Sequence, residues 1–141
     1  MYLDAAYIAK YYVNESDSVA VRSLVIGRRP LVSSAICIAE VASVFHRHAR
    51  EGRITTTKAL ELTRDFVRHV DSEFWILVPV TKRLLRRVAT QLSATPATLF
   101  LRAGDAIHLI TAQNQSETEI WTNDRHLLAA APHFGLTGRS V

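Results

Sequence analysis

Short apolar segments with the composition of β-strands alternate along this chain with segments of helical periodicity. The expected strands are residues 1–4, 31–33, 74–78 and 119–122, with a final edge strand at 134–136. The expected helices are residues 6–13, 17–27, 34–50, 55–70, 81–92, 104–113 and 124–130. Strands that are separated by helices usually pair in parallel, with helices packed on both faces of the sheet. The pattern therefore predicts an α/β fold of three layers (α/β/α), in which helices flank a short parallel central sheet.

Length, charge and cysteine content narrow the class of protein. The 141 residues are enough for a full hydrophobic core, and we expect residues 1–141 to form a single domain. Lys and Arg number 17 against 13 acids, a formal net charge of +4 that suits a polyanionic partner. The single cysteine, Cys37, excludes an internal disulfide and fits a reducing compartment. Lys10 interrupts the first apolar stretch, and no apolar run approaches the roughly 20 residues that span a bilayer. We therefore expect a cytoplasmic protein that does not bind a membrane.

Four of the 13 acidic residues stand apart from other charges. Asp4 ends the opening apolar run, Glu40 is the only charge in residues 31–45, and apolar helical segments begin at Asp105 and Asp124. The other acids lie in polar surroundings that are typical of solvated helix faces. Two like charges about 4 Å apart repel by roughly 4 kcal/mol at an effective dielectric near 20, so a fold that gathers several carboxylates needs a cation. In a basic protein this indicates a divalent metal and phosphate chemistry.

The predicted architecture offers one place where these acids could meet. Ligands of open α/β sheets bind beyond the carboxyl ends of the strands. Asp4 and Asp124 follow predicted strands, and Glu40 and Asp105 lie near the starts of predicted helices. The strand order that would bring them together is not given by the sequence. Each aspartate also has an ordinary alternative role as a helix cap or first-turn acid, and Glu40 could pair with an arginine of its own helix.

Four segments around these acids are specific enough to suggest a family. They read YLDAAYIAKYY around Asp4, SSAICIAEVAS around Glu40, LRAGDAIHLITA around Asp105 and WTNDRHLL around Asp124. In this order and spacing the chain resembles the PIN-domain ribonucleases, and most closely the VapC toxins of toxin–antitoxin pairs. Many relatives carry a serine two residues after the first aspartate, where this chain has Ala6. That polar role is either absent here or taken by a serine of residues 33–34.

The resemblance implies a PIN-like fold and a Mg²⁺- or Mn²⁺-dependent endoribonuclease that cleaves single-stranded or looped RNA. The residues that would hold one or two metal ions are the four isolated acids, Asp4, Glu40, Asp105 and Asp124. Such ions would activate a water for attack on the scissile phosphorus. The resemblance further implies a cognate antitoxin as partner and a homodimer.

Other residues near the four motifs are expected to support the site. Thr122 and Asn123 are predicted to hydrogen-bond the carboxylates, and Ser34 is a further candidate for this supporting role. Arg102 lies one helical turn before Asp105, where it could hold a substrate phosphate or pair with a site carboxylate. His108 is expected to be a packed, hydrogen-bonded residue, because no second cysteine is present to complete a zinc site.

Two other functions remain open from the sequence. A phosphoryl-transfer protein of the receiver or aspartyl-phosphatase type needs an extra acid beside the aspartate of the first strand, but Ala5 and Ala6 follow Asp4. A non-catalytic RNA- or protein-binding module on the same fold would keep the architecture without cleavage. Basic residues at 28–29, 46–53 and 82–87 could track an RNA backbone in either an enzyme or a binding module.

Overall fold

The computed structural model describes residues 1–141 and contains one five-stranded parallel sheet in the order β3-β2-β1-β4-β5. The strands are β1 (Tyr2–Leu3), β2 (Val32–Ser34), β3 (Ile76–Val78), β4 (Glu119–Trp121) and β5 (Thr137–Arg139). The helices are α1 (Ala5–Tyr12), α2 (Ser18–Val25), α3 (Cys37–Arg50), α4 (Thr56–Asp71), α5 (Lys82–Ala94), α6 (Ala103–Asn114) and α7 (Arg125–Ala130), and a 3₁₀ turn, η1 (Ala131–Phe134), follows α7.

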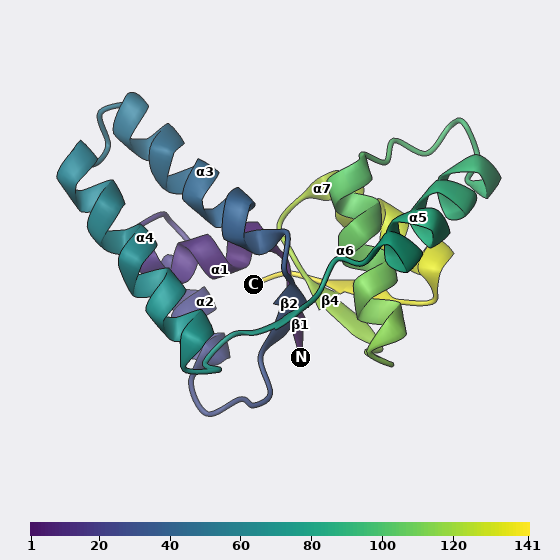
Figure 1. Ribbon diagram of the computed structural model, residues 1–141, viewed down its shortest axis with the longest axis horizontal. Coiled ribbons are helices and arrows are strands. Elements are labelled where there is room, and N and C mark those ends of the chain that lie inside the picture. The colour runs from purple at the N-terminus through teal and green to yellow at the C-terminus, as the bar shows by residue number, and fades with distance from the viewer.

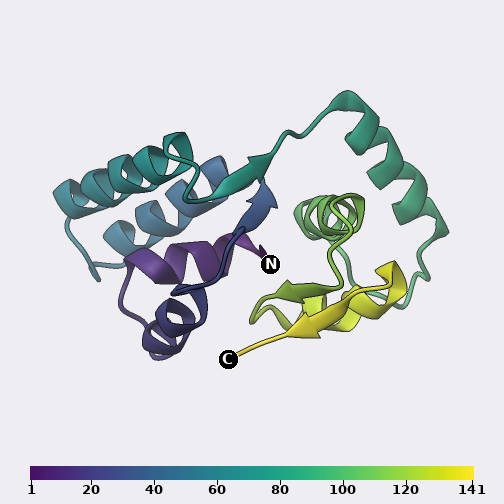
Figure 2. The same ribbon diagram turned by 90° about the horizontal axis from the view of Figure 1, so that it is seen from below.

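The helices form two layers with the sheet between them. Helices α1 to α4 pack together on one face, and α5 to α7 with η1 cover the other (Figure 1). The view from below shows the same separation, with the short strands running between the two helical groups (Figure 2). This arrangement confirms the predicted three-layer α/β/α fold. None of the helices combines the length and the apolar character that crossing a bilayer requires.

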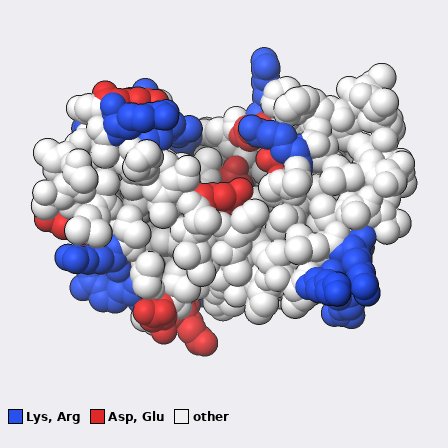
Figure 3. Space-filling model, turned by 45° about the horizontal axis from the view of Figure 1, so that its top comes forward, with Lys and Arg blue, Asp and Glu red and all other residues white.

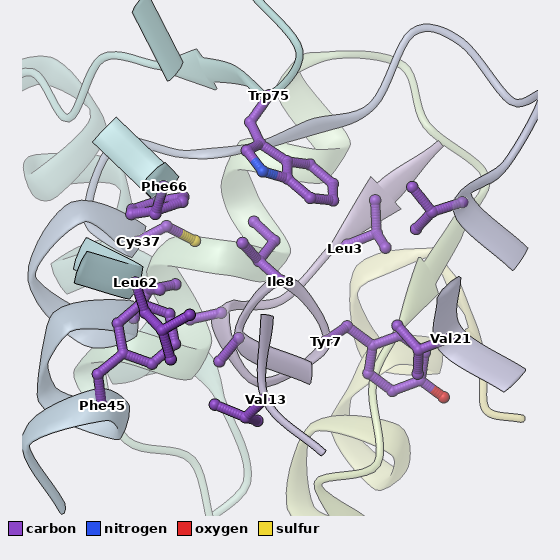
Figure 4. Packing of buried hydrophobic residues seen from close by; sticks show 14 of the residues in the cluster. Leu3, Tyr7, Ile8, Val13, Val21, Cys37, Phe45, Leu62, Phe66 and Trp75 are labelled. Carbon is purple, nitrogen blue, oxygen red and sulfur yellow. The ribbon is translucent and has the colours of Figure 1, made fainter. Parts of the chain in front are cut away.

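Side chains of the sheet alternate between two hydrophobic cores. Leu3 points into the core shared with α1 to α4, whereas its neighbour Tyr2 points into the core shared with α5 to α7. This alternation follows from the two-residue period of a strand. Figure 4 shows the first core, where fully buried aromatic side chains surround Ile8 of α1: Phe45, Phe66 and Trp75. Full burial of one such side chain contributes roughly 1.5–3 kcal/mol.

Several element boundaries differ from the sequence-based expectation, among them the starts of α3 and α4 and the position of the last strand. Helix α3 begins at Cys37, because Ser34 pairs with Val78 and belongs to β2. Helix α4 is capped by Thr55, which lies one residue before the helix. The last strand is at Thr137–Arg139, so the prediction of an edge strand at 134–136 was wrong. Phe134 of that segment closes the 3₁₀ turn and fills the second core.

The strand order creates a switch point in the middle of the sheet. The chain adds β2 and β3 on one side of β1 and then crosses over to add β4 and β5 on the other side. The amide of Asp4 donates to the carbonyl of Trp121 at 3.1 Å, which extends the β1–β4 pairing to the carboxyl edge of the sheet. Crevices at such switch points are the usual ligand sites of open parallel sheets.

Gly138 of β5 lets helix α7 lie directly against the strand. A β-carbon at Gly138 would lie 2.8 Å from Leu128 Cδ2 and 3.2 Å from Leu128 Cα. The backbone of α7 must shift to accept that methyl group. We therefore expect Gly138→Ala to lower the free energy of unfolding by roughly 1–3 kcal/mol, measured by urea denaturation. Thr137→Ala, an exposed change on the same strand, is the control, and an equal effect of the two substitutions would contradict this account.

Candidate active site

A pocket of about 530 Å³ opens beyond the carboxyl edge of the sheet, where the chain enters α1, α3, α6 and α7. All four isolated acids line it: Asp4, Glu40, Asp105 and Asp124. Figure 3 shows acidic atoms gathered in a hollow in the middle of this face, with basic side chains beside them. The fold therefore brings together residues that are as far apart in the sequence as Asp4 and Asp124.

Asp4 lies at the bottom of the pocket and accepts two short hydrogen bonds. Its Oδ1 accepts from the amide of Tyr7 at 2.8 Å, so it caps helix α1, and its Oδ2 accepts from Thr122 Oγ1 at 2.5 Å. Only 5% of Asp4 is exposed. Burial raises the pKa of Asp4 above its ordinary value, and the charge of Glu40 adds to this, although the two hydrogen bonds oppose it. Ionised Asp4 is therefore held in place but poorly hydrated.

Asp124 is held by the start of α7 and remains easy to ionise. Its Oδ1 accepts from the amides of His126 at 2.7 Å and Leu127 at 3.2 Å. Partial burial opposes ionisation, but these amide hydrogen bonds and the guanidinium of Arg102 outweigh it and lower the pKa of Asp124. Thr122 connects this acid to the first one, because its hydroxyl accepts from the Asp124 amide at 2.9 Å and donates to Asp4.

Arg102 bridges Asp105 and Asp124. Its Nε donates to Asp105 Oδ2 at 3.0 Å, and a terminal nitrogen donates to Asp124 Oδ2 at 2.7 Å. The backbone amide of Arg102 also donates to Asp105 Oδ2, at 3.3 Å, so Asp105 completes a capping box at the start of α6. The Arg102 side chain is 58% exposed. Its guanidinium can therefore move away from these acids and stay hydrated.

Glu40 belongs to a partly buried chain of hydrogen bonds that the sequence did not reveal. Its Oε2 lies 2.9 Å from His108 Nε2, and His108 Nδ1 lies 2.9 Å from the hydroxyl of Tyr2. Because an ionised carboxylate only accepts, Nε2 is the donor to Glu40, while Nδ1 shares its hydrogen bond with the Tyr2 hydroxyl. Gly104 makes room for this arrangement, since a β-carbon there would lie 3.1 Å from Glu40 Oε1. The partner of Glu40 is thus His108 and not an arginine of α3.

Two of the predicted supporting residues lie elsewhere. The side chain of Asn123 hydrogen-bonds none of the four acids: its Oδ1 accepts from the hydroxyl of Tyr7 at 2.8 Å, and its amide nitrogen donates to Asp17. Ser34 is fully buried with no hydrogen-bond partner for its hydroxyl, and it does not line the pocket. The side chain of Asn123 points away because the chain turns between Thr122, which faces the sheet edge, and the cap of α7.

Helix α3 contributes pocket residues beyond the expected acid. Ser43 and Arg47 line the pocket together with Glu40. They lie three and seven residues after Glu40, so the helical period places all three on one face. That spacing was the signal that could have identified them. Ser33, a candidate for the polar role absent at Ala6, instead donates its hydroxyl to the Leu3 carbonyl at 2.6 Å.

The donor set of the pocket fits a hard divalent cation. Two guanidinium groups, of Arg47 and Arg102, line it against four carboxylates, so negative charge is in excess. Carboxylate oxygens are the ligands that Mg²⁺ and Mn²⁺ prefer. Donor atoms of Cys37, Glu40 and His108 also lie within 4.8 Å of one another. Burial raises the pKa of Cys37, which disfavours the thiolate that a soft metal prefers.

The sequence and the fold match a known family of proteins. The family description of the PIN domain matches residues 1–132, and the chain belongs to this family. Ribonuclease VapC46 of Mycobacterium tuberculosis is 35% identical over 138 residues, which cover 96% of this chain and 93% of that protein. The crystal structure of Mycobacterium tuberculosis VapC20, a toxin that cleaves the sarcin-ricin loop, superposes with a TM-score of 0.72. It is 14% identical and covers 92% of this chain and 93% of that one, which shows a shared fold.

Because Asp4 is buried, we expect its negative charge to lower the thermal stability of the metal-free protein. Without metal, Asp4→Asn removes a poorly hydrated charge, and we expect its melting temperature at pH 7 to exceed that of the natural protein by roughly 3 °C. A raised pKa means that the penalty exists above that pKa and disappears as the pH falls through it. The difference should therefore shrink in acid. Scanning calorimetry at several pH values measures it.

The exposed pair of Asp65 with Arg68 on α4 supplies the control, because Asp65→Asn removes a solvated charge. That variant should show no such pH-dependent gain. A lower melting temperature for Asp4→Asn at pH 7 would contradict the account, because it would mean that the two hydrogen bonds of the carboxylate outweigh its burial.

Proposed function

We propose that this protein is a Mg²⁺- or Mn²⁺-dependent endoribonuclease and the toxin component of a toxin–antitoxin pair. The observation that carries the proposal is the convergence of four carboxylates, from four different helix starts, in one pocket at the switch point of the sheet. Membership of the PIN domain family and the similarity to a protein named as a ribonuclease support the same activity.

Each acid is assigned a role that its surroundings support. Asp4 and Asp105 are the proposed principal ligands, because both lie deep in the pocket with fixed orientations. Asp124 is proposed to act through a water, since it is more exposed. Glu40, oriented by His108, would ligate or hold the attacking water. A divalent ion bound there would supply an activated water and offset negative charge on the leaving oxygen.

The proposed substrate is RNA in a single-stranded or looped region. Arg102 and Arg47 line the acidic pocket and can meet the phosphates that flank the scissile bond. Arg102 is well suited to this role, because its exposed guanidinium can exchange the carboxylates of Asp105 and Asp124 for a phosphate once a metal neutralises those acids. Unpaired segments are the usual targets of sequence-specific RNA recognition.

A cognate antitoxin, a homodimer and a cytoplasmic location complete the proposal. The pocket accommodates the guanidinium of Arg102 between two carboxylates, and a basic side chain from an inhibitory partner would find the same attraction. The basic composition of the chain suits binding to nucleic acid. These partners rest on membership of the family and on the charge of the pocket.

Cleavage of total cellular RNA by antitoxin-free protein tests the activity. We expect cuts with Mg²⁺ or Mn²⁺, none with EDTA, and a loss of at least roughly 100-fold for Asp4→Asn and Asp105→Asn. Asp65→Asn, which changes a solvated acid, should cleave as the natural protein does. Mapping the new ends by sequencing would identify the target. Intact RNA under all conditions, together with RNA binding that Asp4→Asn does not weaken, would favour the non-catalytic binding module.

Removal of Arg102 should affect metal and RNA in opposite directions. Arg102→Ala frees two carboxylates from their cation, so we expect Mn²⁺ to bind roughly five-fold more tightly by calorimetry. RNA binding, measured in the Asp4→Asn background to prevent cleavage, should weaken because a phosphate contact is lost. Arg68→Ala, which breaks an exposed ion pair on α4, is the matched control. An unchanged affinity for Mn²⁺ would mean that Arg102 does not compete with the metal.

A further inference from the structure

An exposed aromatic pair borders the acidic pocket. Phe100, in the segment between α5 and α6, is 56% exposed and is the only exposed side chain among the Phe, Tyr and Trp residues. Its ring lies against that of His126 of α7, with ring centroids 4.4 Å apart and planes inclined at 46°. Contact with one partially exposed ring leaves most of the Phe100 side chain without packing. An exposed aromatic surface of this kind favours a binding role over a purely structural one.

Cationic side chains lie on both sides of this pair. The guanidinium carbon of Arg102 is 5.9 Å from the centre of the Phe100 ring, and Arg125 Nε donates to His126 Nε2 at 3.3 Å. Arg102 is also the residue that donates to Asp124 in the pocket, at 2.7 Å. Arg102 and the backbone amide of His126 therefore both connect the aromatic pair to the carboxylate of Asp124. A ligand that reached both would offer a flat ring at one end and a phosphate at the other.

We infer that Phe100 and His126 form a subsite that stacks an unpaired nucleobase next to the phosphate held in the acidic pocket. This inference rests on the proposed function and specifies how the substrate is chosen. Arg102 and Arg125 would contact phosphates on either side of the stacked nucleotide. Stacking on an aromatic ring needs a base that is not stacked on its neighbours. Any of the bases can stack in this way. The subsite therefore selects unpaired over paired nucleotides and does not select a particular base.

The surroundings favour a nucleotide over an apolar side chain of a protein partner. An apolar anchor needs an apolar pocket, whereas the Phe100 ring has the polar side chains of His126 and Arg102 beside it. The other large exposed apolar side chains, such as Ile26 and Leu60, are aliphatic and offer no planar ring. Phe100 alone among them combines a planar face, adjacent cations and proximity to the carboxylates.

Binding of short RNA in the Asp4→Asn background tests the inference, with affinity measured by fluorescence anisotropy. Phe100→Ala should weaken binding of a single-stranded oligonucleotide roughly ten-fold, and Phe100→Trp should retain it. For the same RNA in duplex form, Phe100→Ala should have the same affinity as the Asp4→Asn parent. Ile26→Ala, at a more exposed apolar position, is the control and should leave both affinities unchanged.

A scan with RNAs that lack one base at successive positions makes the test specific. In the Asp4→Asn parent, one position should be sensitive to the missing base, and Phe100→Ala should abolish that sensitivity. Equal affinity of Phe100→Ala and the parent for single-stranded RNA would overturn the inference and point to a protein contact at Phe100. An equal loss for single-stranded and duplex RNA would overturn it as well, because stacking would not explain that loss.

The failure of the inference can be told from the failure of the proposed function. If the natural protein cleaves RNA with metal but Phe100→Ala binds single-stranded RNA normally, the nuclease activity is supported and the stacking subsite is contradicted. If no cleavage occurs but single-stranded affinity still depends on Phe100, the subsite is upheld on a binding module. Thermal unfolding of each variant, compared with the parent, separates a loss of binding from a loss of folded protein.

Discussion

Repulsion among four carboxylates at the switch point of the sheet is the constraint on which the rest of this structure depends. Each acid receives a partner that keeps it in place without neutralising the group as a whole. Helix amides hold Asp4 and Asp124, Arg102 joins Asp105 to Asp124, and His108 holds Glu40. Because the remaining charge is negative, the pocket keeps its attraction for a divalent cation.

The ordinary interpretation of the three aspartates as helix-capping residues is confirmed, and the functional interpretation of the four acids stays a prediction. Asp4 and Asp124 are helix N-caps, and Asp105 completes a capping box, as isolated residues of these types often do. What distinguishes them is that the capped helices begin at a common pocket. Their surroundings also make them unequal, since burial raises the pKa of Asp4 while amides and Arg102 lower that of Asp124. Unequal carboxylates suit a site in which acids have different roles.

Supporting residues were harder to predict than the acids. Thr122 was expected near the carboxylates and does connect two of them, but its neighbour Asn123 turns toward Asp17 and Tyr7. Adjacent residues at the end of a strand point to opposite sides, and the turn into α7 decides which of them meets the site. The edge strand was misplaced for a related reason. Phenylalanine is common in strands, but Phe134 fills the second core. Strand β5 pairs with β4 through its backbone and through an exposed ion pair of Arg139 with Glu119.

The sequence by itself determined the alternation of strands and helices, the apolar faces that form two cores, and the isolation of the four acids. These properties depend on local periodicity and on the cost of placing a charge among apolar residues. Only the tertiary structure decided that β1 lies beside β4, that Thr122 meets Asp4 across 118 positions of sequence, and that His108 meets Glu40 across 68. Contacts of this kind depend on strand order and on the docking of separate helices, which no local pattern encodes.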